Sequence, residues 1–444
     1  MPTVLFIQPT QYGPDGSLCK QKKIHLPGLV FPHLAAMTPD HWQVRLLLEV
    51  VDEVDIEAEI SKGVDLVAIG AMGYAIYRGV EIADAFRARG VTVVFGGYMA
   101  SMVAEKVLEH ADSVVIGDAE ISWPMVLADF ERDGTLERTY DHPVTDLSDL
   151  PLPRYELLTE KPLGTMLPVQ AGRGCPHLCS FCSVACIYKG RYLHRPVDDV
   201  MRDIKRVKEL GFKGFYLLDD NIVANPGFLG QLCDRIEPLG MTWASQCSLN
   251  LARNPKLLER VAASGCNLLS LGLESISQEA LDDVGKPWVK VAEHEELLGR
   301  LRDAGIMGSS EMIVGLDSDT PESIRETLAF IDRARVAIPR FYILTPIPGS
   351  ELYHQLDAEG RLVTHEWERF DGSQAVHNPT HLKAEQLTEL YWWLNRQIFS
   401  WRSIMRRTLL NPAARKQPGM HLFAFGVNMH YRRYVMKRVP PNIF

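Results

Sequence analysis

The sequence has no long hydrophobic run. Hydrophobic residues make up 46% of its 444 residues, but no stretch reaches the roughly 18–20 uncharged residues that a transmembrane helix needs. The opening residues, MPTVLFI, have no basic segment of the kind that begins a signal peptide, and they are typical of a first strand. We therefore expect a globular chain of two or three domains, because 444 residues are too many for one ordinary core.

Cysteine is also scarce, and its placement is uneven. Three of the eight cysteines fall inside eight residues, and no export signal precedes them. Clustered cysteines in a chain that is not exported indicate metal binding in a reducing compartment, not disulfide bonds. The expected location is the cytoplasm.

Acidic residues are missing from residues 390–444, which contain ten Arg or Lys residues. The rest of the chain has 37 basic and 56 acidic residues. A basic tail on an acidic body can meet an anionic partner, or it can dock on the body itself. We do not expect nucleic acid as a partner, because no recognised binding motif accompanies the charge.

The clustered cysteines occupy residues 175–182, CPHLCSFC, directly after the apolar, strand-like residues 166–171. Thiolates are soft ligands that suit zinc or iron–sulfur clusters. Closed zinc or cluster sites usually take four protein ligands. Three cysteines at this spacing, Cys175, Cys179 and Cys182, therefore indicate a [4Fe–4S] cluster with one iron left open. A zinc knuckle and three unrelated thiols remain the alternatives.

Two glycines and an aromatic residue accompany the cysteines. Gly172 and Gly174 would let the backbone turn tightly around a bulky cluster, and Phe181 precedes the third cysteine. With the cysteine spacing, this segment resembles the signature of radical S-adenosylmethionine (SAM) enzymes. The resemblance implies that the three cysteines ligate the cluster and that SAM chelates the open iron. Cys186 is then not expected as a ligand, because it would occupy the iron that SAM needs.

Residues 1–140 alternate apolar, β-branched runs with helical patterns. This alternation predicts a doubly wound parallel sheet, whose ligands sit at the carboxyl ends of the strands. The predicted strands are residues 4–8, 43–48, 65–70, 92–95 and 113–116. Glycines at such ends allow close approach of a flat or phosphorylated ligand, although any parallel sheet needs glycine in these turns.

Together with the cluster motif, residues 1–140 resemble the Rossmann-like cobalamin-binding domain of B12-type radical SAM enzymes. The resemblance implies cobalamin contacts near the strand ends, for which the candidates are Gly70, Met72, Gly96, Gly97 and Gly117. Many such domains supply a cobalt-ligating histidine after the first strand. Residues 9–16, PTQYGPDG, contain none, so we expect cobalamin to bind without a histidine ligand. A vestigial or substrate-shaping domain is the alternative.

Residues 141–164 begin with a segment rich in proline and aspartate that predicts a linker. From residue 165 to 350, about six strand–helix repeats predict a partial (β/α)6 barrel, in which chemistry sits where strands end. Residues 351–444 are predicted to form a helical, basic C-terminal region. The expected fold class is therefore α/β, with a Rossmann-like domain, a radical SAM barrel and a helical end.

Several residues at the predicted strand ends of the barrel match family positions that contact SAM. Asp219 closes the second strand, Gln246 the third and Glu274 the fourth, while Ile313 lies in an element similar to Gly-x-Ile-x-Gly. The resemblance implies that these residues and Phe181 contact SAM. A carboxylate at a strand end can instead cap the next helix.

The last hundred residues carry two further signals. Residues 367–372 resemble a segment of the Mg-protoporphyrin-cyclase-like branch of the family. Residues 383–409 predict one long helix packed over the barrel, or alternatively an amphipathic surface for lipid or for a large hydrophobic substrate.

The resemblance implies an enzyme that reductively cleaves SAM to a 5′-deoxyadenosyl radical and, with cobalamin, methylates an unactivated carbon. A cobalamin-independent cyclase, rearrangement or oxidation enzyme is the alternative, followed by a non-catalytic Fe–S or SAM-binding module and a zinc-binding structural protein. No catalytic residue is assigned. The expected partners are a small-molecule substrate, which could be large, hydrophobic or anionic, and an electron donor such as flavodoxin or ferredoxin. Peripheral membrane contact through the basic end is a further expectation.

Overall fold

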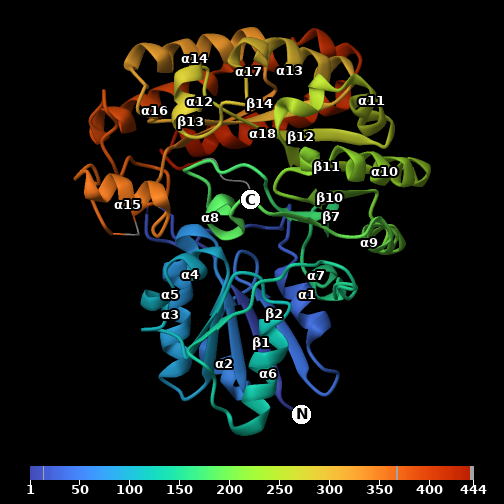
Figure 1. The fold of residues 1–444 in the computed structure, drawn as a ribbon, viewed down its shortest axis with the longest axis vertical. Helices are drawn as coiled ribbons and strands as arrows, with labels where there is room; N and C mark the ends of the chain where they lie inside the picture. Colours follow the sequence, from blue (N-terminus) through green and yellow to red (C-terminus); the bar gives the residue numbers. More distant parts are fainter. Residues whose placement is uncertain (14, 367–368, 441–444) are drawn as a thin grey trace. The chain divides into compact units, whose positions relative to one another are not determined.

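A computed structural model describes residues 1–13, 15–366 and 369–440 of the chain. The chain forms two compact units, Met1–Pro168 and Val169–Phe444 (Figure 1). The finer domain boundaries expected at residues 140, 164 and 350 stay predictions. Of the segment that resembles the cyclase-like branch, Trp367 and Glu368 lie outside the described residues.

The first unit is built on a sheet whose described strands follow the order β2-β1-β3-β4-β5-β6. All neighbouring pairs in it are parallel. The strands are β1 (Thr3–Gln8), β2 (Gln43–Leu48), β3 (Leu66–Gly70), β4 (Thr92–Gly96), β5 (Ser113–Ile116) and β6 (Thr139–Asp141). The predicted doubly wound parallel sheet is confirmed, and β6 is a strand that the sequence did not predict.

Helices cover this sheet, and its core is aromatic and aliphatic. The helices are α1 (Val30–Met37), α2 (Ile56–Ser61), α3 (Ile76–Arg87), α4 (Tyr98–Met102), α5 (Ala104–Val107), α6 (Ser122–Asp133) and α7 (Glu156–Thr159). The ring of Phe6 in β1 lies 5.0 Å from Phe31 in α1 and 5.4 Å from Trp123 in α6. Gly79 lets α3 approach the sheet, because a Cβ there would lie 2.6 Å from the Phe95 ring.

The expected linker, residues 141–164, packs against the first unit. Leu147, Tyr155 and Leu158 are fully buried. The hydroxyl of Tyr155 donates to the carbonyl of Pro168 at 2.9 Å. Apolar side chains therefore hold this proline-rich segment in place although it has little regular structure.

The second unit contains a sheet whose described strands follow the order β14-β13-β12-β11-β10-β7. The pairs from β10 to β14 are all parallel. The strands are β7 (Met166–Gln170), β10 (Gly214–Leu218), β11 (Thr242–Cys247), β12 (Cys266–Glu274), β13 (Met307–Val314) and β14 (Ile338–Ile343). Helices alternate with them along the chain, as the predicted partial (β/α)6 barrel requires.

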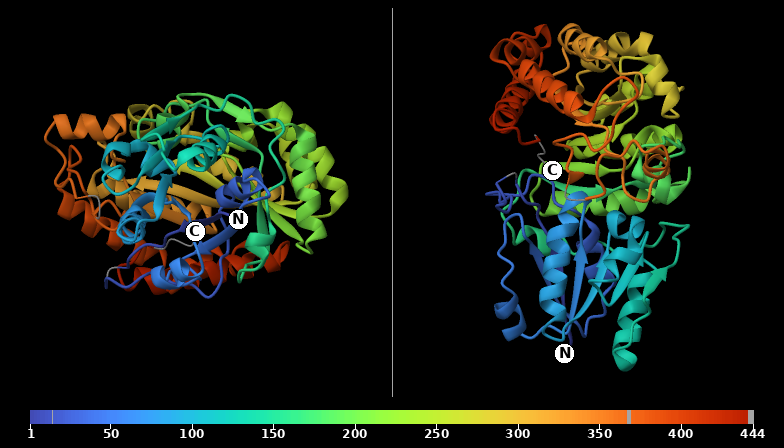
Figure 2. Two further views of the ribbon diagram at one scale, coloured as in Figure 1. Left: turned by 90° about the horizontal axis from the view of Figure 1, so that it is seen from below. Right: turned by 90° about the vertical axis from the view of Figure 1, so that its left-hand side faces the viewer.

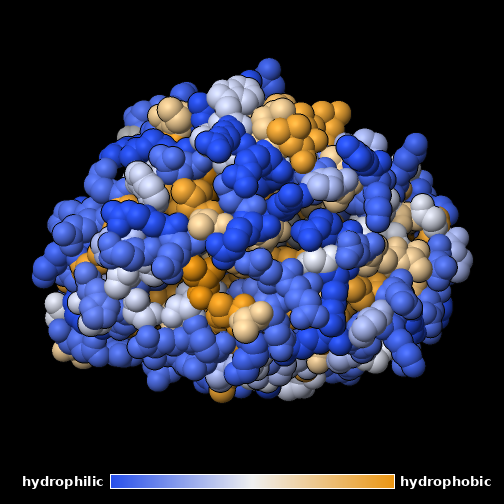
Figure 3. Space-filling view, turned by 90° about the horizontal axis from the view of Figure 1, so that it is seen from above, coloured by the Kyte–Doolittle hydropathy of each residue, from blue (hydrophilic) through white to orange (hydrophobic). Residues whose placement is uncertain are grey.

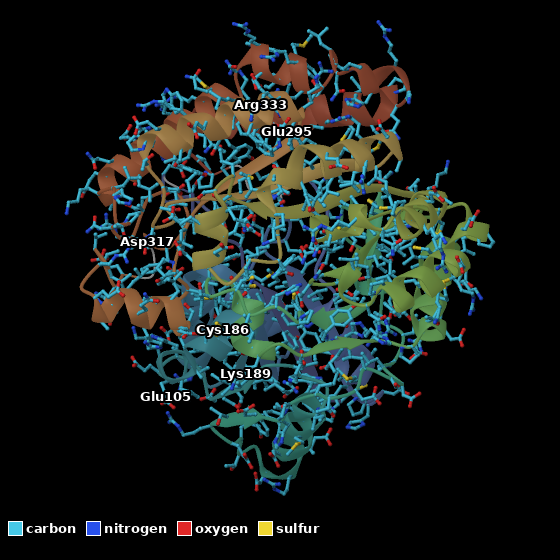
Figure 4. All side chains as sticks on the ribbon, turned by 45° about the horizontal axis from the view of Figure 1, so that its top comes forward. Glu105, Cys186, Lys189, Glu295, Asp317 and Arg333 are labelled. Atoms are coloured by element: carbon cyan, nitrogen blue, oxygen red, sulfur yellow. The ribbon has the colours of Figure 1, made fainter. Side chains whose placement is uncertain are left out.

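These helices form an outer layer, which Figures 1 and 2 show on one side of the strands. They are α9 (Val197–Glu209), α10 (Pro226–Ile236), α11 (Pro255–Ala263), α12 (Gln278–Asp283), α13 (His294–Asp303), α14 (Pro321–Ala334), α15 (Glu351–Ala358) and α16 (Ala384–Ile398). Arg333 of α14 and Glu295 of α13 form an ion pair of 3.2 Å across this layer (Figure 4).

The C-terminal helices differ from the sequence prediction in one respect. Instead of one helix over residues 383–409, α16 ends at Ile398 and α17 (Trp401–Arg407) begins a new direction. Ser400 between them is extended, with ψ 151°, and its hydroxyl accepts the backbone N–H of Ser403. A serine that caps a new helix therefore overrides the continuous apolar period.

Arg407 fastens these helices to the barrel. Its side chain is fully buried and donates to the carbonyls of Val336, Ala337 and Ile398 and to Asn428 of α18 (Pro418–Val435). Part of the basic charge of the C-terminal region is therefore internal. Among the described residues, no helix is long and apolar enough to cross a membrane.

Candidate active site

The cysteine motif forms a loop closed at its base by two short strands. After β7, β8 (Gly172–Gly174) pairs antiparallel with β9 (Tyr192–His194). Residues 175–182 and α8 (Ser183–Tyr188) lie between these strands. The pairing fixes both ends of the loop, so the cysteines are held at a defined position beside the barrel strands.

Both glycines of β8 are required by close approach. A Cβ on Gly172 would lie 2.5 Å from a carboxylate oxygen of Asp219, and one on Gly174 would lie 2.1 Å from the carbonyl oxygen of Arg191. Gly174 also has a φ of +81°, which L side chains rarely adopt. The two glycines therefore serve the close packing of a short strand, and their expected role in a turn around the cluster stays a prediction.

The thiols of Cys175, Cys179 and Cys182 are near enough to act on one another. Burial is the main cause that raises the pKa of all three thiols, and the neighbouring thiolates add to it for Cys179 and Cys182. With all causes together, the pKa of Cys179 is raised to about 11. Backbone N–H groups of Val184 and Ala185 at the start of α8 act in the opposite direction on Cys182. Because metal coordination deprotonates a thiol, these groups fit a cationic cluster and would release protons on binding it.

Three thiols on one loop suit an iron–sulfur cluster, because thiolates are soft ligands and each can bind a different iron. Among the described residues, no three His, Cys, Asp or Glu side chains are grouped so as to hold a single metal ion.

Cys186 has different surroundings from these three thiols. It is half-buried on α8, and the charged neighbour that acts on its pKa is Glu351 at the start of α15. Figure 4 shows Cys186 near Lys189, which ends the same helix. Its surroundings match the expectation that it does not bind the cluster, which stays a prediction.

The three residues after β10 tie the cysteine loop to the barrel. Asp219 accepts the Tyr192 hydroxyl at 2.8 Å and the backbone N–H of Asn221 at 2.8 Å. Asp220 accepts the backbone N–H of Gly174 at 2.6 Å. The amide of Asn221 lies 3.8 Å from the sulfur of Cys175. Burial raises the pKa of Asp219 to about 7. Its hydrogen bonds to Tyr192 and Asn221 give it a structural role beside the cysteine loop, whether or not it also contacts SAM.

Glu274 ends β12 in a strained conformation. Its φ is +60°, in the left-handed region that non-glycine residues avoid. Its carboxylate accepts the Lys286 ammonium at 2.6 Å, and Lys286 also donates to the carbonyl of Gly272 at 3.0 Å. Both charged side chains are at most a tenth exposed. Local strain that persists in a buried ion pair is typical of a functional site.

The segment after α12 packs directly on the cysteine loop. The Trp288 ring stacks on His177 at 3.8 Å, and the Lys286 ammonium lies 5.4 Å from the centre of that Trp288 ring. The backbone N–H of Ser180 donates to the carbonyl of Val284 at 3.2 Å. Sequence reasoning missed this segment, because it lies at no predicted strand end and has no family motif.

Two of the predicted SAM residues share an apolar wall. Phe181 of the cysteine loop and Ile313 of β13 both pack on a buried group formed by Ala280, Val284, Leu316 and Leu344. Gln246 stands elsewhere, as an exposed residue near the end of β11, in register with Ser270 of β12. The structure therefore brings Phe181 and Ile313 together and leaves Gln246 on a different part of the sheet.

A polar group in the middle of the strands was also missed. Glu311 of β13 receives the guanidinium of Arg340 in β14, with the nearest atoms 2.5 Å apart, and the hydroxyl of Ser270 at 2.6 Å. These charged side chains are 19% and 17% exposed. A charged residue inside each of these two strands was the available signal, since such residues are rarely buried without a partner.

In the first unit, the candidate ligand residues lie at the ends of three adjacent strands. Gly70 ends β3, Gly96 ends β4 and Gly117 follows β5. Gly97 has a φ of +103°, and a Cβ there would lie 2.9 Å from the carbonyl oxygen of Ala71. No atom lies within 4 Å of a Cβ built on Gly117, a Cβ on Gly96 would be in ordinary contact with Val115 at 3.9 Å, and Met72 is 68% exposed. Such a glycine edge fits a large flat group that approaches the backbone.

The long first loop of this unit offers no imidazole beside these glycines. Residues 9–16 contain no histidine, and Tyr12 in this loop hydrogen-bonds to Glu81 of α3. His33 is buried on α1, and His25 lies where the loop passes Gly164.

Comparison with known proteins identifies the second unit. The model of the Radical SAM superfamily matches residues 169–331. Bacteriochlorophyllide d C-8(2)-methyltransferase of Chlorobaculum tepidum is 29% identical over 398 residues, covering 85% of this chain and 87% of that protein. Residues 169–331 therefore form a Radical SAM domain.

Two solved structures share the fold of this radical SAM protein. TsrM, a radical S-adenosylmethionine methyltransferase from Kitasatospora setae with cobalamin and [4Fe–4S] cluster bound, has a TM-score of 0.69 at 15% identity, covering 93% of this chain and 90% of that one. OxsB, a cobalamin-dependent radical enzyme with aqua-cobalamin and S-adenosylmethionine bound, has a TM-score of 0.71 at 13% identity, covering 100% and 73%.

Several expectations about this radical SAM protein are thereby confirmed. It has the expected α/β fold and is an enzyme of the expected family. The two solved neighbours contain the cofactors that the sequence predicts. The non-catalytic module, the zinc protein and the cobalamin-independent reactions are not favoured. The roles of individual residues toward SAM, cluster and cobalamin stay predictions.

Proposed function

We propose that this enzyme methylates an unactivated carbon of a small-molecule substrate, using a [4Fe–4S] cluster, SAM and cobalamin. The observation that carries the proposal is the pairing of three interacting thiols with a glycine-edged parallel sheet in one chain. Its likeness to a methyltransferase along 85% of its length supports the same reading. When bound, the cluster supplies an electron to SAM and cobalamin carries the methyl group, which is chemistry that side chains do not provide.

The second unit would hold the cluster and SAM. Cys175, Cys179 and Cys182 are the proposed cluster ligands, and the Asp219 and Asn221 region keeps their loop against the barrel. The apolar wall around Phe181 and Ile313 would exclude water from the adenosyl group. Gln246 and Glu274, on the neighbouring strands β11 and β12, are the remaining proposed SAM contacts.

The first unit would hold cobalamin through backbone contacts at Gly70, Gly96, Gly97 and Gly117, with Met72 exposed beside them. We propose that no histidine ligates the cobalt, because residues 9–16, where the family's ligand would stand, contain none. The test is reconstitution with hydroxocobalamin, followed by gel filtration and EPR spectroscopy. Cobalamin that does not co-elute would refute binding, whereas nitrogen hyperfine splitting from an imidazole would refute only the ligation claim.

The substrate class is inferred from a relative that matches 85% of this chain. The Chlorobaculum tepidum protein is named for a bacteriochlorophyllide, so we propose a large, rigid and mainly apolar substrate such as a tetrapyrrole. Methyl groups of SAM carrying a heavy isotope should appear in the product when extracts or candidate tetrapyrroles are supplied. Transfer to small polar metabolites only would overturn this proposal.

We further propose that the enzyme works in the cytoplasm with a flavodoxin- or ferredoxin-type electron donor. All eight cysteines are free, which suits a reducing compartment. Leu178, between two of the proposed ligands, is 63% exposed, so the loop offers a route for an incoming electron. Reduction of the cluster by reduced flavodoxin should be measurable by EPR, and a cluster that only a chemical reductant can reach would argue against this partner.

Peripheral membrane contact is proposed for α17 and α18. Seen from above in Figure 3, hydrophobic side chains stand at the edge of a mostly hydrophilic face. The exposed apolar residues of this region are Trp401, Leu409, Leu410, Leu422, Phe423 and Met436. Basic residues without acidic neighbours in the chain accompany them, a composition that suits anionic lipid. The enzyme should sediment with phosphatidylglycerol vesicles and not with phosphatidylcholine vesicles, and the L422S/F423S variant should lose this binding.

The cysteine assignment has a direct test. Anaerobic reconstitution should give about four irons per chain. Replacing Cys175, Cys179 or Cys182 by Ala should abolish the iron–sulfur absorbance and the formation of deoxyadenosine from SAM. Cys186→Ala is the matched control and should keep both. Full turnover in any of the first three variants would refute the assignment.

A further inference from the structure

Lys286 is a buried cation that lies in the segment packed on the cysteine loop. Its side chain is 7% exposed. The ammonium donates to the Glu274 carboxylate at 2.6 Å and to the carbonyl of Gly272 at 3.0 Å. It also faces the Trp288 ring at 5.4 Å. A lysine is rarely buried to this extent unless its charge is paired, and here the pair lies against the proposed cluster site.

Contacts on both sides of Lys286 attach its segment to the cysteine loop. On one side of it, the carbonyl of Val284 accepts the backbone N–H of Ser180 at 3.2 Å. On the other side, Trp288 stacks on His177 at 3.8 Å with the ring planes 16° apart. Gly285 between them has a φ of +73° and approaches the Leu178 carbonyl so closely that a Cβ would lie 3.2 Å from it. The ammonium is therefore held at a fixed distance from the loop.

The contacts of its segment place the charge of Lys286 beside the cysteine loop. Val284 and Gly285 approach Ser180 and Leu178, and Trp288 stacks on His177, so the loop is contacted on both sides of the lysine. Charges interact more strongly in a buried site than in water.

We infer that Lys286 is a positioning residue which holds Glu274 at the end of β12 and raises the reduction potential of the cluster. The inference rests on the proposed function, because it presumes that a cluster binds the three cysteines. One electron added to a cluster held by three thiolates increases its negative charge. A fixed ammonium beside the loop favours that reduced state. Reduction potentials of such clusters depend on net charge and local burial in this way.

The test measures the cluster and not turnover. Full-length wild-type enzyme and the K286M, K286R and K290M variants are reconstituted and titrated without SAM, with the reduced cluster followed by EPR. At a fixed potential, K286M should show a roughly tenfold lower ratio of reduced to oxidised cluster, which corresponds to about 59 mV for one electron. K286R keeps the charge and should lie within about twofold of wild type. K290M removes an exposed lysine of the same segment and should not differ.

A double variant separates the lost lysine from the carboxylate left without a partner. In K286M alone, Glu274 is buried without its cation, which can disturb the fold. K286M/E274Q removes both charges, and it should still titrate below wild type because the segment that carries the ammonium contacts the cysteine loop on both sides of Lys286. A wild-type potential in both variants would overturn the inference, as would a loss of SAM affinity with an unchanged potential. Wild-type protein that takes up no iron would instead refute the proposed function itself.

Discussion

The carboxyl ends of the strands carry different kinds of residue in the two units. In the first unit the adjacent ends of β3, β4 and β5 present glycine, with open space beside Gly117. In the second unit the ends of β10 and β12 present carboxylates that are already engaged, Asp219 by Tyr192 and Glu274 by Lys286. One edge exposes backbone, whereas the other is filled with interlocked side chains.

The difference between the two sheet edges matches what each proposed cofactor needs. A large cofactor that binds without a protein ligand to its metal requires a wide surface and few side chains, so backbone approach decides the fit. A cluster bound covalently through thiolates requires its ligands at fixed positions, which hydrogen bonds around the loop provide. The two units should accordingly fail in different ways when a side chain is added where glycine stands.

The largest effect is expected at Gly174. Gly174→Ala places a Cβ 2.1 Å from the Arg191 carbonyl at a φ of +81°, so β8 and β9 must separate. The left-handed conformation costs about 1–2 kcal/mol and the clash about 1–3 kcal/mol more. A loss of about 1.4 kcal/mol in the free energy that holds the loop in place corresponds to a tenfold change. Iron content after anaerobic reconstitution should therefore fall by at least about tenfold.

Gly211→Ala is the matched control for this variant. Gly211 has a similar φ of +88°, but nothing lies within 4 Å of the position that a Cβ would take there. It should lose a small amount of stability and keep its iron. Equal iron content in both variants would show that the β8–β9 pairing does not position the cysteines.

A smaller and separate effect is expected in the first unit. Gly97→Ala would bring a Cβ to 2.9 Å from the Ala71 carbonyl at a φ of +103°, which costs about 2–4 kcal/mol in this unit. Hydrogen exchange in residues 66–117 should increase, and the cobalamin that co-elutes should decrease several-fold. Iron content should not change.

Gly90→Ala serves as its control, because Gly90 has a φ of +77° with no atom within 4 Å of an added Cβ. If Gly97→Ala lost iron as well as cobalamin, the two units would not respond independently to local strain. If it lost neither, the glycine edge would not be the cobalamin site.

Most of the fold was accessible from sequence because its signals are local. Alternating β-branched and amphipathic runs predicted the strands from β1 to β5 and the barrel strands β7 and β10 to β14 to within a few residues, while β6 was too short to stand out. The break at Ser400 was missed because an apolar period of 3.6 continued through it. A capping hydroxyl outweighed that period.

The candidate site was only partly accessible, for a physical reason. The cysteines and their glycines form one continuous segment, so spacing alone indicated them. Lys286 meets Glu274 across twelve residues, and Arg340 meets Glu311 across 29. Partners of this kind are set by strand register and by loop packing, which no local pattern encodes.

The smallest effect concerns acid stability around the buried histidines of the second unit. The largest shifts in the pKa of these histidines are those of His294 at the start of α13 and His377 beside the Gly315 carbonyl. Burial lowers the pKa of each to about 4, below the ordinary value of about 6.5. Between these values the unfolded chain binds more protons than the folded one, so the free energy of unfolding falls as the pH falls from 6.5 toward 4.

At pH 5.5 each histidine should have removed on the order of 1 kcal/mol of the stability present at pH 7.5. Hydrogen exchange at the two pH values, corrected for its intrinsic rate, should therefore show more opening in α13 than in α3. His294→Leu should remove about half of the difference, because the ring nitrogens of His294 have no hydrogen-bond partner among the described residues. His381→Leu, at an exposed position, is the control. An unchanged pH dependence in His294→Leu would show that this imidazole is hydrated in solution. The greater opening of α13 at low pH would then have another source.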